Sequence, residues 1–461
     1  MNYSLYKLIF GAFFLLTAVS CRKYVELEPK GKITPTTIDD YKLLINNNKV
    51  FGLSYGTNDF PTDDIAFASE VLVNKLSSDP LLRIYRWDPQ FYQANEDDPE
   101  WNLFYQQVYT ANVIINGVNE LENGSIEQKA MLIAQAKVHR AYAYLCLVNL
   151  YAKHYDPSTA KTDLGIPLLL KPTSTQPLER AYIEAIYNQI LDDLNTAIEP
   201  LPDIVGSKTY PSKAAVYAIL ARTYLLMGEY EKASHYAGLT LELQNGLLDL
   251  ADILTSAPAG FPFPGFYVPA TVSDPEVILI KSANNQDAPL NLSDELLTML
   301  GDKDLRKTLY TFNGPDLGNP AGIFYAYFAP LEQRQVGPRV PEMILIKAEC
   351  QARTGQYKEG LDLINELRKK RFKPTDYTAL VAADAEEALV KILAERRREL
   401  FGRGFRLFDL KRLNKDSRFE KTVIHPLNSE TLTLLPNDNR YVYPITSKLI
   451  NMNPEIQPNL R

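Results

Sequence analysis

Two clusters of acidic residues are the first candidates for chemistry in this sequence. Asp63 and Asp64 are adjacent, and Asp97, Asp98 and Glu100 follow further along the chain. A glycosidase needs two facing carboxylates, one as general acid and the other as base or nucleophile. Both clusters lie in loop-like sequence without a histidine or a nucleophile signature beside them. We therefore expect these acids to be solvated and not catalytic.

Aromatic residues in loop-like sequence are better candidates, because they suit ligand binding. Most of the 28 tyrosines, such as Tyr142 and Tyr224, fall at helical spacing and are expected to pack between helices. A flat ring covers the C–H face of a sugar, while nearby Asp, Asn or Arg side chains bond its hydroxyl groups. The segment "RWDPQFYQANEDD" holds both kinds of side chain. The predicted ligand-binding residues are Tyr55, Trp87, Tyr92, Phe263, Tyr267, Tyr325 and Tyr327.

An arginine-rich motif, "ERRRELFGRGFRLFDLKR", lies near the C-terminal end of the chain. Such a cluster could bind phosphate or nucleic acid. The chain has a net charge of −7 and only short basic runs, which argues against a nucleic-acid partner. We expect the charges to pair with one another and with helix ends, fixing how helices dock. The residues concerned are Arg396, Arg397, Arg398, Glu399, Arg403, Arg406 and Asp409.

The three cysteines of the chain differ in their surroundings. Cys21 follows an apolar run, residues 8–19, which has signal-peptide length and is too short to span a bilayer. This pattern resembles a bacterial lipobox, so we predict a signal peptide over 1–20 and lipidation at Cys21. Cys146 and Cys350 lie in helical patterns and are predicted to be small buried residues. No cysteine–histidine cluster indicates a metal site.

Helical periodicity dominates two regions, about 100–245 and about 339–413. Each contains a glycine turn between two helical segments, with Gly228, Tyr230 and Ala233 in one and Gly355, Tyr357 and Gly360 in the other. Glycine suits the left-handed position after a helix, and the small residue lets two helices approach. This is the core pattern of a tetratricopeptide repeat.

The regions between and before the repeats carry few helical signals. Residues 246–338 are rich in proline, glycine and aromatics, so an insertion must leave the helical stack and return to it. Within it, "EVILIKS" (Glu276 to Ser282) predicts a strand. Residues 51–98 are predicted to form surface loops. The predicted fold is mainly α, a tetratricopeptide-repeat-like helical scaffold with a loop-rich, minor-β insertion.

These landmarks, in order along nearly the whole chain after Cys21, resemble the SusD/RagB family of outer-membrane nutrient-binding lipoproteins. The resemblance is carried by "CRKYVELEPKG", "KAAVYAILARTYLLMGEYEKA", "ERRRELFGRGFRLFDLKR" and "YVYPITSKLINMNPEIQPN". It implies a single SusD-like domain over 21–461, with ligand-binding loops in about 51–98 and 246–338. It also implies an oligosaccharide ligand, a TonB-dependent SusC-like transporter as partner, a lipid anchor facing the cell exterior, and neither catalysis nor a cofactor.

Two other functions stay open at the level of sequence. A peptide is the first alternative ligand, since grooves between tetratricopeptide helices and some members of the family are compatible with peptide capture. A glycan-cleaving enzyme is the second. Incubation with a panel of glycans separates the three functions. Binding without product indicates glycan capture, release of product indicates an enzyme, and binding to peptides without binding to glycans indicates peptide capture.

Overall fold

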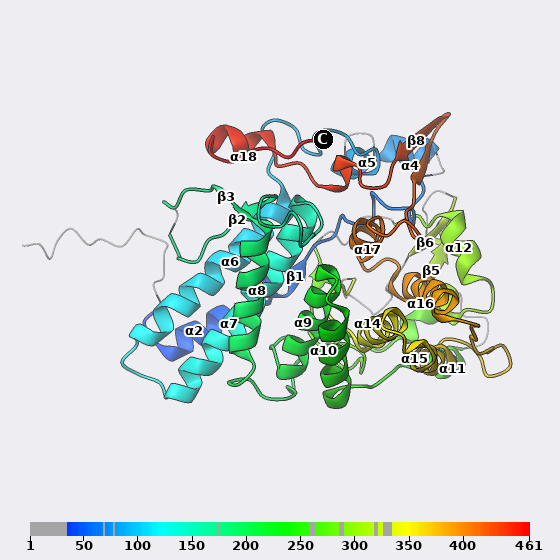
Figure 1. Cartoon of the computed structure of the whole chain (residues 1–461), viewed down its shortest axis with the longest axis horizontal. Coiled ribbons are helices and arrows are strands. Elements are labelled where there is room, and N and C mark those ends of the chain that lie inside the picture. Colours follow the sequence, from blue (N-terminus) through cyan, green and yellow to red (C-terminus); the bar gives the residue numbers. More distant parts are fainter. Residues whose placement is uncertain are drawn as a thin grey trace, which may run out of the picture. The chain divides into compact units, whose positions relative to one another are not determined.

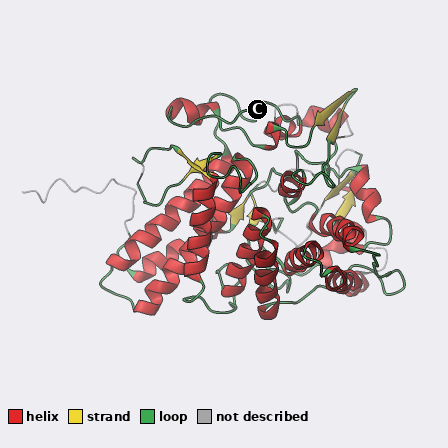
Figure 2. Ribbon diagram, in the orientation of Figure 1, coloured by secondary structure: helices red, strands yellow, loops and turns green. Residues whose placement is uncertain are grey.

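Helices are the main regular structure in the part of the chain that the computed structural model describes. That part comprises residues 35–67, 70–76, 79–173, 175–258, 263–284, 290–317, 321–325 and 334–461. Within it, the strands are short and each sheet contains two of them (Figure 2). Residues from Ile38 to Arg461 form one structural unit. The prediction of a mainly α fold is confirmed.

Three long helices precede the repeats and lie side by side (Figure 1). They are α6 (Pro99–Gly117), α7 (Ile126–Tyr151) and α8 (Ile183–Ala197). Ser125 and Gln128 form a capping box at the start of α7, which satisfies free backbone N–H groups there. Because α7 packs against both α6 and α8, its second half is buried on every side. Smaller elements nearby are α2 (Ile38–Ile45), α3 (Asn48–Phe51), η2 (Val118–Glu120), β2 (Leu164–Pro167) and β3 (Arg180–Tyr182).

The two predicted repeats are present and stack on each other. Their helices are α9 (Lys213–Met227) and α10 (Tyr230–Leu243), then α14 (Val340–Arg353) and α15 (Tyr357–Lys369). Gly228 and Gly355 have φ of 77° and 91°, in the left-handed region predicted for them. A Cβ on Gly360 would lie 2.7 Å from the carbonyl oxygen of Ala348. The predicted close approach of the two helices therefore exists, and α10 packs against α14 across the insertion (Figure 1).

The insertion contains short helices and strands. They are α11 (Leu250–Ser256), η3 (Pro264–Tyr267), β4 (Ser282–Ala283), α12 (Asp294–Leu300), α13 (Leu305–Leu309), β5 (Thr311–Asn313), η4 (Gly314–Leu317) and β6 (Ile323–Tyr325). The predicted strand from Glu276 to Ser282 is regular only at Ser282, but the segment runs antiparallel to residues 335–340. Val277 forms an isolated bridge with Arg339 and Ser282 with Gln335, and the N–H of Ile278 donates to the carbonyl of Pro338. The N–H of Ile280 donates instead to the carbonyl of Lys208, so the ladder between the two segments is interrupted.

The region predicted as surface loops, 51–98, contains β1 (Leu53–Ser54), α4 (Glu70–Lys75) and α5 (Pro80–Tyr85). The expectation of exposure is wrong for residues 54–65, all of which are buried. The physical reason is charge pairing. Asp59 pairs with Arg334 and Asp63 with Arg406, so the carboxylates of this segment have charged partners inside the protein.

The C-terminal part consists of α16 (Ala385–Leu400), α17 (Arg406–Leu413), the hairpin β7 (Val423–Leu427) and β8 (Glu430–Leu434), η5 (Asn439–Tyr441) and α18 (Ser447–Met452). The prediction that the arginine motif forms internal ion pairs is confirmed. Arg396 pairs with Asp409 at 2.9 Å and Arg397 with Asp64 at 2.7 Å. Cys146 and Cys350 are buried and unpaired, as expected.

A buried ionic network ties the insertion to the repeats. Arg306, from α13, lies 2.6 Å from Glu395 and 2.7 Å from Glu399, both on α16. Arg371 bridges Glu399 at 2.8 Å and Glu276 of the insertion at 2.7 Å. Such hydrogen-bonded charges fix relative position because removal of one partner leaves the other buried and unpaired.

Candidate functional site

Three of the predicted ligand-binding aromatics lie in the core, and those three predictions are corrected here. Tyr55 is 1% exposed and its ring meets Phe408 edge-on at 5.6 Å. Tyr325 is 8% exposed and packs edge-on against Phe401. Trp87 is 2% exposed. Side chains with so little free surface pack under loops and offer no ring face to a ligand in this structure.

Trp87 belongs to a column of stacked rings. Its indole lies 4.3 Å from the His425 ring, and Tyr85 lies 3.9 Å from the other face of that ring. Phe67 extends the column at 4.3 Å from Tyr85. The indole Nε1 donates to the carbonyl of Pro61 at 3.0 Å. Because His425 comes from β7, far away in sequence, this burial is a tertiary effect that a local pattern does not show.

The remaining predicted aromatics do not form one site with these. Tyr92, between α5 and α6, is half-buried, and burial together with Asp98 and Glu100 raises the pKa of its hydroxyl. Phe263 and Tyr267 lie at η3, against α11 and α13, and Tyr267 is 41% exposed. Tyr327 and Cys21 lie outside the described residues.

The acidic clusters were expected to be solvated, and for four of the five residues this is wrong. Asp63 and Asp64 are held by arginines, as described above. Asp98 caps α6 and accepts from the Tyr151 hydroxyl at 2.6 Å, and burial raises its pKa to about 6. Glu100 accepts from the backbone N–H of Gly56 at 2.7 Å, and burial with nearby Asp98 raises its pKa to about 7. Their hydrogen bonds give these carboxylates a structural role.

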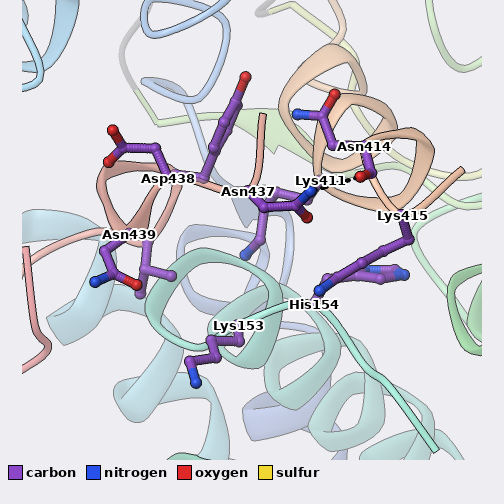
Figure 3. A pocket seen from close by; sticks show the side chains of 10 residues that line it. Lys153, His154, Lys411, Asn414, Lys415, Asn437, Asp438 and Asn439 are labelled. Atoms are coloured by element: carbon purple, nitrogen blue, oxygen red, sulfur yellow. Dashed lines mark hydrogen bonds between the residues drawn. The ribbon is translucent and has the colours of Figure 1, made fainter. Parts of the chain in front are cut away.

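A polar hollow of about 230 Å³ is the best-defined candidate site on the described residues (Figure 3). Two wider hollows, of about 690 and 400 Å³, adjoin it. The first shares His154 and Lys415 with it, and the second shares Lys153, Asn439 and Val442. We call the three together the polar groove and the smallest its central hollow.

Helix ends and one turn build the central hollow. The chain leaves α7 at Tyr151 and presents Lys153 and His154, while the end of α17 presents Asn414 and Lys415. The turn before η5 contributes Asn437 and Asp438, and η5 with the residue after it contributes Asn439, Tyr441 and Val442. Figure 3 shows His154 and Lys415 beside each other on one side, with Asp438 and Asn439 on the opposite side.

Local chemistry holds that turn in shape. Asn437 has φ of 60°, a left-handed conformation that asparagine tolerates better than most residues. Its side-chain amide donates to the carbonyl of Asn414 at 2.7 Å, drawn as a dashed line in Figure 3. Asp438 caps η5 by accepting from the backbone N–H of Arg440 at 2.8 Å. The turn is therefore tied both to itself and to the end of α17.

Lys411, from α17, joins the hollow to the scaffold. Its ammonium donates to the carbonyls of Asn149 at 2.5 Å and Ala152 at 2.7 Å, at the C-terminal end of α7. A cation at a helix C-terminus satisfies free carbonyls and the negative end of the helix dipole. Burial lowers the pKa of Lys411 to about 7, and burial together with Lys411, Arg412 and Lys415 lowers the pKa of His154 to about 3.

Three buried polar atoms of the hollow have no hydrogen-bond partner of good geometry among the described residues: the side-chain nitrogen of Asn414, the hydroxyl of Tyr441 and Nδ1 of His154. Asn414 and Tyr441 are 1% and 4% exposed. Burial raises the pKa of Tyr441 to about 12, although the neighbouring side chain of Asn414 is one of the groups that lower it, so its hydroxyl is available as a donor. Buried polar groups are nearly always hydrogen-bonded, so unpaired ones in a hollow indicate that a ligand or water completes them.

The outer hollows extend the same chemistry. The wider one adds the half-buried rings of Tyr155 and Tyr230 and the guanidinium of Arg418. The other adds Arg180 and Asn459, which fasten the C-terminal tail: Arg180 donates to Gln457 at 2.9 Å and Asn459 to Tyr151 at 2.8 Å. Amide and ammonium donors, with a few ring faces, suit a ligand rich in hydroxyl or anionic oxygen atoms.

The sequence-based predictions missed this groove. The available signal is the set of asparagines in "KRLNK" and "PNDNRY", polar residues placed directly after a helix and in a turn. No sequence pattern shows that these segments meet the end of α7.

Known proteins match this chain over nearly its full length. A sequence model of the family described as "Starch-binding associating with outer membrane" matches residues 23–225, and a model of the "SusD family" matches 338–460. SusD-like protein P38 of Formosa agariphila is 23% identical over 96% of this chain and 95% of its own.

Solved structures share the fold. A putative sugar-binding protein of Bacteroides vulgatus superposes with a TM-score of 0.72 at 19% identity, covering 93% of this chain and 99% of that one. A structure named as a laminarin-binding SusD-like protein gives a TM-score of 0.61 at 18% identity, covering 92% and 99%. At such identities the likeness concerns the fold alone.

Proposed function

Because this chain belongs to the SusD/RagB family, we propose that it binds glycans at the outer membrane and passes them to a SusC-like, TonB-dependent transporter without cleaving them. The polar groove is the observation that carries the binding step. The buried donors of its central hollow that lack a partner can be completed by oxygen atoms of a ligand, which would accept their hydrogen bonds. The sizes of its two outer hollows lie within the range of about 300–1,000 Å³ that is usual for ligand sites.

Saccharides fit this groove better than apolar ligands do. Each sugar ring presents several hydroxyl groups, which both donate and accept. Side-chain amides such as those of Asn414 and Asn439 also offer both functions, and ammonium groups add donors. In the widest hollow, the half-buried Tyr155 and Tyr230 can cover the C–H face of a sugar. Tyr92, Phe263 and Tyr267 stay proposed as further glycan contacts outside the groove, and Tyr327 stays proposed as a glycan contact.

The proposed lipid anchor and the proposed delivery of glycans to a transporter are supported by membership of the family. A lipidated Cys21 would hold the protein at the outer membrane, in line with the association with the outer membrane that describes the family matching residues 23–225. In the described part of the chain, none of the helices combines the length and the hydrophobicity that a membrane span requires. More than one acyl chain is needed for a stable anchor, which the lipid-modified cysteine of such proteins would supply.

The test is a binding and hydrolysis assay of the mature protein on a panel of oligosaccharides. Calorimetry would measure affinity, and chromatography of the same mixtures would detect products. Asn439→Ala is the site variant, because Asn439 is exposed and lines two of the three hollows. Asn123→Ala is the matched control, since Asn123 is equally exposed and lies in the loop before α7, outside the groove.

We expect binding without products, and a loss of affinity of about tenfold for Asn439→Ala only, the value of one good hydrogen bond. Products from the wild type would replace the proposal by an enzyme. Binding of peptides with no response to glycans would replace it by peptide capture. Equal affinities for the two asparagine variants and the wild type would remove the groove as the site.

A further inference from the structure

The central hollow contains positive charge that the protein itself does not neutralise. Among the described residues, no carboxylate lies within ion-pairing distance of Lys411 or Lys415. Lys411 is 5% exposed and uses two of its three N–H donors on backbone carbonyls. Lys415 is exposed and lines both the central hollow and the wider one. Burial lowers the pKa of Lys411 to about 7, and a bound anion would favour its charged form.

Three of the acids near these lysines pair with other cations, and a fourth, Asp156, accepts hydrogen bonds from Ser158. Asp438 pairs with Arg440 at 2.8 Å, Asp163 with Lys153 at 2.8 Å, and Asp416 with Arg418 at 2.7 Å. The chain as a whole has a net charge of −7, so an excess of positive charge in one groove is a local feature. It is not a general property of the surface.

The pKa values of neighbouring titratable groups reflect the positive charge of these lysines. After the effect of burial, the positive charges of Lys411, Arg412 and Lys415 all lower the pKa of His154. Lys415 also contributes, after the hydrogen bonds from Ser158, to the lowered pKa of Asp156. Cations in the hollow therefore disfavour a further positive charge and favour a negative one. The donors that lack partners, on Asn414 and Tyr441, add to that preference.

We propose that the polar groove selects glycans with an anionic substituent, whose oxygen atoms lie in the central hollow against Lys415, Lys411 and the amide of Asn414. This inference rests on the proposed function, because it names the class of glycan for the same groove. A carboxylate or sulfate accepts several hydrogen bonds at once, and bonds from charged donors are roughly twice as strong as neutral ones. A neutral sugar would supply no counter-charge to Lys415 or to the protonated form of Lys411.

The chemistry has two sources, a uronic acid carboxylate or a sulfate ester, and the experiment separates them. Affinities are measured for pairs of oligosaccharides that differ only in charge: oligogalacturonate and its methyl ester, and a sulfated galactan and its desulfated form. Each pair is measured at low and at high salt. The variants are Lys415→Met, at an exposed position, and the matched control Lys358→Met, exposed in α15 and outside the groove.

We expect the charged member of at least one pair to bind about tenfold or more tightly than its neutral partner, with an advantage that shrinks at high salt. Lys415→Met should remove most of that advantage, and Lys358→Met should keep it. The pair that responds identifies the substituent.

Two results would overturn the inference, and they differ in what else they overturn. Equal binding of charged and neutral members, unchanged by Lys415→Met, would leave the proposed glycan-binding function standing and remove only the charge selection. Failure to bind any member of either pair, or any glycan of the wider panel, would overturn both proposals together.

Discussion

Replacing Trp87 by alanine separates two interpretations of the same residue. If Trp87 were a ligand platform, as its loop-like sequence predicts, truncation would weaken glycan binding and leave the fold intact. The structure instead places it in the core, 2% exposed and stacked at 4.3 Å on His425. We therefore expect Trp87→Ala to destabilise the protein.

The magnitude follows from what the indole contacts. Truncation of a buried Trp to Ala typically costs about 3–5 kcal/mol, through lost burial and the cavity left behind. That range includes the Nε1 hydrogen bond to the carbonyl of Pro61, worth about 1 kcal/mol. The backbone has φ of 55° at Trp87, a conformation that alanine does not relieve. At about 1 °C per kcal/mol for a unit as large as Ile38–Arg461, the thermal midpoint should fall by roughly 3–6 °C.

The assay is urea unfolding followed by fluorescence and circular dichroism, with glycan affinity measured on the folded protein. Trp87→Phe should give an intermediate loss of about 1–2 kcal/mol, because a ring can still stack on His425 while the hydrogen bond is gone. Tyr267→Ala is the control from the same set of predicted contacts. Since Tyr267 is 41% exposed, its truncation should change stability by about 0.5 kcal/mol or less.

One result would refute this argument. The free energy of unfolding of Trp87→Ala could lie within about 1 kcal/mol of the wild-type value while the variant loses glycan affinity. In that case the indole would be a ligand contact. The interpretation from sequence would then be correct, and the stack with His425 would be of no energetic importance.

Three further predictions concern charge and anchoring. Glu395→Gln should lower the free energy of unfolding in urea by about 3–5 kcal/mol, because Glu395 accepts from two buried arginines at 2.6 Å. The control is Glu387→Gln on the same helix, whose ion pair at 2.6 Å is partly exposed and whose loss should cost about 0.5 kcal/mol or less. Equal losses for the two variants would contradict the argument. The folded-state pKa of Glu100 is raised from 4.5 to about 7, so its stabilising effect is complete below pH 4.5 and is lost as pH rises through 7, by about 3 kcal/mol. Glu100→Gln should flatten thermal midpoints measured between pH 4 and 8, and an unchanged slope would assign the titration elsewhere. Cys21→Ala should move the protein from the membrane fraction to the soluble fraction of fractionated cells, and retention in membranes would exclude the lipid anchor.

The helical scaffold could be predicted because its signals are local. Gly228 and Gly355 each mark a helix end within a few residues of the apolar pattern that they interrupt, and both adopt the expected left-handed backbone. The arginine motif was also interpretable, since so many charges in an acidic chain need partners. The particular partners of these arginines, such as Asp63 and Asp64, could not be predicted, because they lie more than 300 positions away in the sequence.

The candidate site could not be predicted for the same physical reason. Trp87 and "EVILIKS" have the local composition of a loop and of a strand. Their surroundings are set by β7 in one case and by an interrupted antiparallel pairing with residues 335–340 in the other. The polar groove joins residues 153–154, 411–415 and 437–442, and the bond from Lys411 to the end of α7 spans 262 positions. Periodicity and spacing carry no information about such a contact.

The construction of the groove also decides which residues can report on binding alone. Lys411 holds α17 against the C-terminal carbonyls of α7, so its replacement would disturb the scaffold and the hollow at once. Asn437 and Asp438 shape the turn through their own backbone and side-chain bonds. Asn439 and Lys415, in contrast, are exposed on segments that these other contacts already fix. Ligand recognition at those two positions is therefore separable from stability, and substitutions there could retune the ligand without repacking the fold.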